Sequence, residues 1–178
     1  MSQRARSPFG YALVALAIVV GSIIVTTSLA ESAPIGSLAQ FQAVEPCRIV
    51  DTRGTGAAGQ VGDIYPGETR NFDVVGYVGA PYFLDQGAPG CDIPSSATAV
   101  ELTFTSVEPY NKGFLRAWPA SSGSSAAGAT VLNYTGGLNL NPTNSVTVAI
   151  GPGPDGELYV RNYGGFTFLV IDVTGYYQ

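Results

Sequence analysis

The stretch Phe166–Tyr176, FTFLVIDVTGY, has the clearest strand pattern in the sequence, because apolar residues stand on both of its alternating faces. One face would carry Phe166, Phe168, Val170, Asp172 and Thr174. The other face would carry Thr167, Leu169, Ile171 and Val173. A strand with two apolar faces is typical of a position inside a sheet that is covered on both sides. We therefore expect a central strand with material packed on each side, at least in part.

The same period of two recurs along the preceding chain. Thr98–Ser106 places apolar residues on one face and mostly polar ones on the other, which is typical of a half-buried antiparallel strand. Strands are expected at Leu38–Val44, Arg48–Thr52, Thr69–Val75, Thr98–Val107, Gly113–Trp118, Thr130–Tyr134, Ser145–Ile150, Leu158–Asn162 and Phe166–Val173. The spacers are rich in Gly, Pro and Asn. The predicted fold class is all-β, a single antiparallel β-sandwich of jelly-roll or Greek-key type over residues 44–178.

The first 30 residues have the order of an export signal. Arg4 and Arg6 precede the uncharged stretch Ser7–Ala30, which is apolar at its centre and small and polar at its end. This order predicts a signal peptide, residues 1–30, cleaved after Ala30. The alternative is an uncleaved membrane anchor, because the uncharged stretch of 24 residues exceeds the roughly 20 that span a bilayer. This anchor would be the only part of the protein that we expect to contact a membrane. Either way the rest is exported, and residues 31–43 form an extension leading into the first strand.

The composition excludes several classes of function. The 178 residues include 8 basic and 13 acidic side chains, for a net charge of −5, and no histidine. His-ligated metals, Ser–His–Asp and Cys–His catalytic arrangements and a His general base are therefore excluded. No run of basic residues is present, so nucleic acid is not an expected partner. We expect no metal and no cofactor.

Cys47 and Cys91 are the two cysteines of the sequence. In an exported domain, such a pair is expected to form a disulfide. The redox alternative would use a C-x-x-C motif, which is absent, and a zinc site would need two further ligands.

Several motifs resemble those of one known family. Cys47–Arg53, CRIVDTR, resembles the "PCRLLDTR" opening of a β-module common in exported bacterial surface proteins, especially of actinobacterial type. Val170–Tyr177, VIDVTGYY, resembles the closing "VDVQGYF" of that family. Between them, AVELTF, GFLRAWP, LNY and NSVTV are similar to its internal motifs, at Ala99–Phe104, Gly113–Pro119, Leu132–Tyr134 and Asn144–Val148.

The resemblance covers about residues 44–178, nearly the whole of the predicted exported chain. It implies a module of the kind appended to secreted enzymes or found on cell-surface and adhesion-like proteins, with no settled catalytic activity of its own. Because no enzyme domain accompanies the module in this sequence, we expect an independent surface or matrix protein.

Charged residues in the predicted strands offer one candidate site. Asp51 and Arg53 stand two residues apart, on one face of a strand-like segment. They could bind a sugar or a carboxylate, but we favour a structural charge network in which Asp172 is paired, with Arg48, Arg53 and Arg161 as possible partners. Glycoside hydrolysis would need two nearby carboxylates, for which the available acids are Glu101, Asp51, Asp172 and Glu108. We do not expect an enzyme.

Aromatic residues offer the better hint of binding. Tyr and Trp rings stack on sugars and anchor protein partners. The candidates for ligand binding are Trp118, Tyr110, Tyr134, Tyr163 and Tyr177. The alternative is that Phe114 and Trp118 belong to the core while the tyrosines line the rim of the sandwich.

The predicted function is non-catalytic: an exported cell-surface or extracellular-matrix protein acting by adhesion or assembly. One form of assembly is self-association into filaments, in which residues 31–44 add a strand to a neighbouring copy. The alternatives are a polysaccharide-binding module that uses exposed Tyr and Trp, and a carboxylate-dependent glycoside hydrolase. The expected partners are therefore a second copy of the chain or a cell-surface polysaccharide.

Overall fold

The computed structural model describes residues 39–126, 128–150 and 156–178. The predicted signal peptide, its cleavage point after Ala30 and residues 31–38 lie outside the described residues. Within the described part of the chain, no helix is long and apolar enough to cross a membrane.

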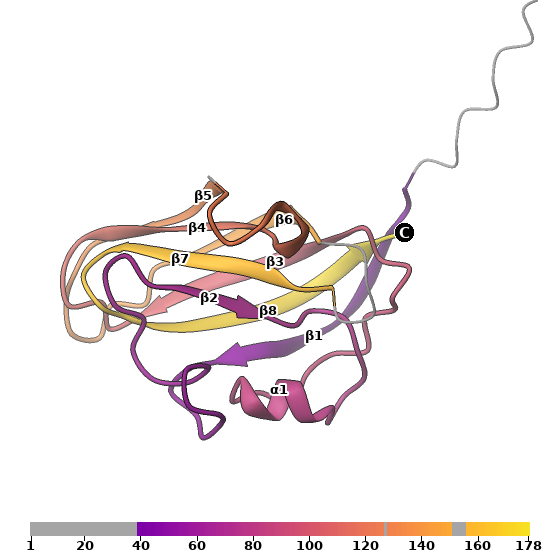
Figure 1. The fold of residues 1–178 in the computed structure, drawn as a ribbon, viewed down its shortest axis with the longest axis horizontal. Helices are drawn as coiled ribbons and strands as arrows, with labels where there is room; N and C mark the ends of the chain where they lie inside the picture. The colour runs from indigo at the N-terminus through magenta and orange to yellow at the C-terminus, as the bar shows by residue number, and fades with distance from the viewer. Residues whose placement is uncertain (1–38, 127, 151–155) are drawn as a thin grey trace, which may run out of the picture. The chain divides into compact units, whose positions relative to one another are not determined.

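Two antiparallel sheets of four strands each form the domain, which confirms the predicted all-β sandwich (Figure 1). In spatial order, the first sheet contains β1 (Phe41–Asp51), β8 (Phe168–Tyr177), β3 (Ala99–Val107) and β6 (Thr143–Ala149). The second contains β2 (Thr69–Phe72), β7 (Leu158–Gly164), β4 (Gly113–Pro119) and β5 (Ala129–Tyr134).

The strand order is that of a jelly roll. β1 pairs with β8, β2 with β7, β3 with β6 and β4 with β5, as in a long antiparallel hairpin rolled into two layers. Apart from the consecutive pair β4 and β5, the paired strands are far apart in the chain, so the sheets bring together segments that local sequence cannot align.

The core lies between the two sheets and follows the predicted alternation. Val100, Leu102 and Phe104 of β3 are fully buried, while the residues between them are partly exposed. β8 lies between β1 and β3, so its predicted central position is confirmed. Leu169 and Ile171 point into the core, and Val170 on the opposite face is also only 3% exposed.

The structure merges the first two predicted strands into one. β1 runs through Glu45 and Pro46 because its register against β8 jumps between Ala43 and Cys47, leaving the intervening residues outside the ladder. A proline has no N–H to donate, so a bulge is the place where a strand can hold it.

A short helix, α1 (Pro81–Asp85), and a 3-10 turn, η1 (Ala120–Ser122), fall in spacers that we expected to be turns. With five residues, α1 is too short to produce the apolar stripe by which a helix is recognised in a sequence. Pro81 opens it, where the missing N–H has no role in the helix.

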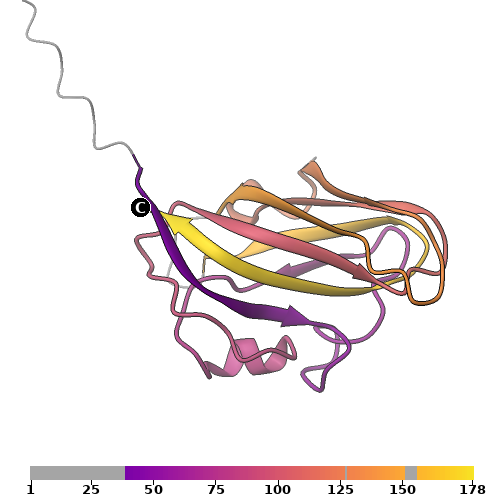
Figure 2. The same cartoon turned by 180° about the vertical axis from the view of Figure 1, so that it is seen from behind.

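The segment after α1 covers the outer edge of β1 (Figure 2). The Asp51 amide donates to the Gln86 carbonyl at 3.0 Å, and the Gly90 amide donates to the Arg48 carbonyl at 3.0 Å. The predicted Cys47–Cys91 disulfide is formed and ties this segment to the strand. β1 therefore has partners on both edges over its second half.

Candidate functional site

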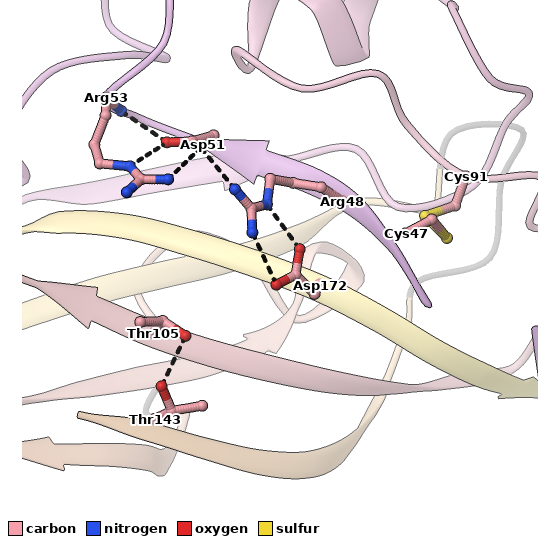
Figure 3. A network of polar contacts seen from close by, with 8 residues as sticks. All are labelled: Cys47, Arg48, Asp51, Arg53, Cys91, Thr105, Thr143 and Asp172. Carbon is pink, nitrogen blue, oxygen red and sulfur yellow. Dashed lines mark hydrogen bonds and ion pairs between the residues drawn. A yellow bond between two sulfur atoms is a disulfide. The ribbon is translucent and has the colours of Figure 1, made fainter. Parts of the chain in front are cut away.

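The four charged residues singled out in the sequence form one chain of ion pairs on the outer face of the first sheet (Figure 3). Arg53 forms a bidentate ion pair with Asp51, in which its Nε and one terminal nitrogen donate to the two carboxylate oxygens at 2.8 and 2.7 Å. Arg48 donates to Asp51 at 2.9 Å and also to both oxygens of Asp172, at 2.8 and 3.3 Å. The register places Arg48 directly opposite Asp172 on neighbouring strands, which explains this contact.

The two arginines of the network favour the ionised form of the Asp51 carboxylate. The hydrogen bond from Arg53, followed by its further contacts with Arg53 and Arg48, lowers the pKa of Asp51 below its usual value. The bond to Asp172 is the main cause that raises the pKa of Arg48. Both oxygens of Asp51 accept two hydrogen bonds each, so little capacity remains for an outside ligand. Arg161, the third expected partner, lies instead on β7 of the other sheet.

Two of the five aromatic candidates are buried, which corrects the expectation that they face a ligand. Tyr134 is 4% exposed, and its hydroxyl donates to the Asn162 side chain and also lies 2.9 Å from the Gly165 carbonyl. Trp118 occupies an outward position of β4, but the chain that follows folds over it. Its indole N–H donates to the Gly123 carbonyl at 2.9 Å, and Gly128 lies against the ring.

The other three aromatic candidates reach the surface at separate places. Tyr110 is 67% exposed and stacks on Phe166 with ring centroids 4.8 Å apart. Tyr177 ends β8 in the first sheet and contacts Phe41. Tyr163 lies on β7 of the second sheet, so the five candidates do not form a single site.

Tyr163 belongs to a denser cluster on the outer face of the second sheet. Five partly exposed side chains of β4 and β7 form what we call the aromatic–arginine face: Phe114, Arg116, Tyr159, Arg161 and Tyr163. The Phe114 and Tyr163 rings are stacked, with centroids 4.8 Å apart and planes at 6°. The guanidinium carbons of Arg116 and Arg161 lie 5.2 and 5.1 Å from the Tyr163 ring centroid, within cation–π range.

The register of β4 and β7 arranges this face in rows. Phe114 stands opposite Tyr163, Arg116 opposite Arg161, and the covered Trp118 opposite Tyr159. Each strand carries the same pattern, an aromatic residue on either side of an arginine with one inward residue between, as FLRAW at 114–118 and YVRNY at 159–163. Sequence reasoning missed this face because the matched patterns gain meaning only once the two strands are known to pair.

A hollow adjoins the stacked rings. It has a volume of about 460 Å³ and is lined by Phe114 and Tyr163 together with Lys112, Asn133 and Thr135, among others. A second hollow, of about 310 Å³, lies further along β5 and shares Asn133 with the first. Aromatic rings beside amide, ammonium and hydroxyl groups are the mixture that a polar, ring-shaped ligand requires.

The predicted strand-addition segment is partly used within the domain itself. Residues 41–43 pair with β8, and Gln40 and Gln178 exchange backbone hydrogen bonds of 2.8 and 3.2 Å. The other edge strand of the first sheet is β6, most of whose residues are exposed.

Comparison with protein-family models and with curated protein sequences found no match for this chain.

Proposed function

We propose that this protein is an exported, non-catalytic module that acts at the cell surface or in the extracellular matrix by adhesion, and that it binds polysaccharide through the aromatic–arginine face. The observation that carries the proposal is the row arrangement of stacked rings and guanidinium groups on an open sheet face, beside a mainly apolar hollow that continues along β5 to a polar one. Aromatic rings next to hydrogen-bond donors suit the apolar faces and hydroxyl rims of sugars.

Export is supported by the disulfide, because such bonds persist in oxidising compartments. The basic, apolar and small-residue order of residues 1–30 points the same way. The resemblance of residues 44–178 to modules of bacterial surface proteins agrees with a surface location.

The arrangement of the carboxylates weighs against the hydrolase alternative. The guanidinium of Arg48 lies between Asp51 and Asp172, where a substrate and its attacking water would have to fit. Glu101 lies near the start of β3 and Glu108 follows its last residue, Val107. The six strand steps from Glu101 to Val107 alone span about 20 Å, far more than the separation that glycosidases use. The depressed pKa of Asp51 also makes this residue a poor general acid.

The test is retention on insoluble polysaccharides by the protein purified as the cell exports it. We expect retention on at least one glycan, and a loss of at least tenfold in affinity for Phe114→Ala and for Tyr163→Ala. Tyr77→Ala is the matched control, because Tyr77 is a 62% exposed tyrosine in a loop outside this face. Trp118→Ala is not a suitable probe, since that ring is covered. Failure to bind any glycan would reject the proposal.

Self-association is the second candidate function, and the exposed edge of β6 supports it. An exposed edge strand rich in Thr, Ser and Asn can accept a strand from another copy, and β6 carries no lysine that would oppose this. Filaments in electron micrographs of the purified protein would support assembly, provided that Ser145→Lys on β6 or deletion of residues 31–38 abolishes them. Monodisperse monomers at all concentrations would reject it.

A further inference from the structure

We infer that the ligand of the aromatic–arginine face is an acidic polysaccharide with uronate carboxylates, which Arg116 and Arg161 bind together. The inference rests on the proposed glycan-binding function and adds the chemical class of the sugar. It begins from the pairing of the two arginines, which stand directly opposite each other on β4 and β7. Like charges directly opposite each other on neighbouring strands destabilise a sheet. A negatively charged ligand that contacts both arginines would relieve this repulsion.

These two arginines differ from the other three in the described part of the chain. Arg48, Arg53 and Arg70 each form an ion pair with a carboxylate. Arg116 and Arg161 have no carboxylate partner among the described residues, and the Nε atom of each is buried without a hydrogen-bond acceptor. A buried donor without a partner is costly. Both side chains are partly exposed, so a ligand carboxylate can approach these guanidinium groups and supply the counter-charge that the protein does not.

The neighbours of the two guanidinium groups provide further donors rather than acids. Across the sheet, Thr69 is the register partner of Arg161, and Thr130 is the register partner of Arg116. The row therefore reads Thr69, Arg161, Arg116 and Thr130 over all four strands. Lys112 lines the hollow at the end of the same strand as Arg116. Such a row offers hydrogen bonds and positive charge to an anion.

The attraction must be local, because the protein as a whole is acidic. With 13 acidic and 8 basic side chains, its net charge of −5 would repel a polyanion rather than collect it. A polyanion can therefore bind only where basic groups are concentrated, as around Arg116 and Arg161, which no carboxylate pairs in the described part of the chain. The acid beside this face, Glu157, accepts a hydrogen bond of 2.9 Å from Asn71, the register partner of Tyr159, which places it beyond the arginine row.

The spacing of the rows favours a carboxylate attached directly to a sugar ring. Phe114 and Arg116 are two residues apart on a strand, a step of roughly 6.7 Å. A pyranose in contact with the Phe114–Tyr163 pair would place a carboxylate on its own rim near the next row. The planar carboxylate also matches the forked donors of arginine. A sulfate or phosphate ester adds a linking atom and a tetrahedral group, which moves the charge further from the ring.

The experiment compares two forms of one polymer. Exported, purified protein is run by affinity electrophoresis in gels containing polygalacturonate or the same polymer with its carboxylates methyl-esterified. We expect retardation by polygalacturonate that weakens with added salt, and at least tenfold weaker retardation by the esterified form. Arg116→Gln and Arg161→Gln should each weaken polygalacturonate binding at least tenfold. Arg161→Lys should weaken polygalacturonate binding at least threefold, because lysine keeps the positive charge but lacks the paired N–H donors of the guanidinium group.

Arg53→Gln is the matched control, since it removes one positive charge from the turn after β1, away from this face, and should change affinity less than twofold. Unfolding midpoints of all variants show that each is folded. Equal binding of the esterified polymer, equal loss in Arg53→Gln, or tighter binding of dextran sulfate than of polygalacturonate would overturn the inference. Binding of a neutral glycan that Phe114→Ala abolishes and Arg116→Gln does not would leave the proposed function intact while rejecting the uronate ligand.

Discussion

Tyr134 and Asn162 form a polar pair inside the sandwich. The phenol donates to the Asn162 side-chain oxygen, while the Asn162 amide donates to the carbonyls of Ile64 and Gly165, both at 2.8 Å. Every polar atom of this fully buried amide therefore has a partner. Burial is the main cause that raises the pKa of Tyr134 to about 12.

The pKa of Tyr134 predicts a loss of stability in alkali. A folded-state pKa above the ordinary value of about 10 means that the stabilisation is complete below pH 10 and disappears as the pH rises toward 12. Tyr134→Phe should remove this pH dependence and lower the free energy of unfolding at pH 7 by about 1–3 kcal/mol, because the Asn162 oxygen loses its donor. Urea titrations from pH 7 to 11.5 measure both effects. Tyr77→Phe, at an exposed position, should do neither.

The lowered pKa of Asp51 predicts a loss of stability in acid. Its pKa is lowered in the folded protein, so its contribution is present above about pH 4 and is lost as the pH falls further. Asp51→Asn should lower the free energy of unfolding by about 1 kcal/mol at pH 7, since the ion pairs are partly exposed, and should flatten the decline between pH 5 and 2. Glu45→Gln, on the exposed side of β1, is the control. An unchanged acid profile in Asp51→Asn would contradict the assignment.

At the scale of the elements, β8 depends on close contact with its neighbours. Gly175 is the register partner of Ala43 on β1 and of Glu101 on β3. A Cβ atom there would lie 2.3 Å from the Phe41 ring and 2.8 Å from the Gln42 carbonyl oxygen. The pairing of the start of β1 with the end of β8 therefore requires glycine at position 175.

Gly175→Ala should separate β1 from β8 at this end and lower the free energy of unfolding by about 1–3 kcal/mol. Hydrogen exchange should quicken at the amides of residues 41–43 before it changes elsewhere in the sheet. Thr174→Ala, one residue earlier on β8, should have a smaller effect because nothing is forced into the backbone. Unchanged exchange in Gly175→Ala would show that β1 accommodates the methyl group.

At the scale of the whole domain, the disulfide connects β1 to the segment that covers its edge. Cys47 and Cys91 are 44 residues apart in the sequence, with Cα atoms 5.7 Å apart. The bond restricts the unfolded chain and also holds the 86–90 segment against β1, where it blocks pairing with another molecule.

Cys47→Ala/Cys91→Ala should lower the free energy of unfolding by about 4 kcal/mol, the chain-entropy value for a loop of this length. It should also increase aggregation, because the edge of β1 opens more often. Thermal unfolding and light scattering measure the two effects, and the wild-type protein with reductant should behave as the variant does. Free thiols in protein recovered from cells would contradict the oxidising location.

The alternation of side chains along the chain was enough to predict the sandwich, the half-buried face of β3 and the central position of β8. These features follow from period-two burial, which is a local property. The cysteine pair also followed from composition, because two thiols in an exported domain have few alternatives. The five-residue helix did not follow, since it is shorter than the repeat that identifies a helix.

The tertiary structure was needed to show which strands are neighbours and which residues cover the outer faces of the two sheets. Trp118 and Tyr134 have the sequence character of binding residues, but a following loop covers one and the other finds its partner on β7. Arg116 and Arg161 are 45 positions apart in the sequence, and the antiparallel pairing of β4 with β7 makes them adjacent. Alternation states which side chains share a face of one strand. Long-range pairing decides which faces combine, because it depends on the packing of the whole core.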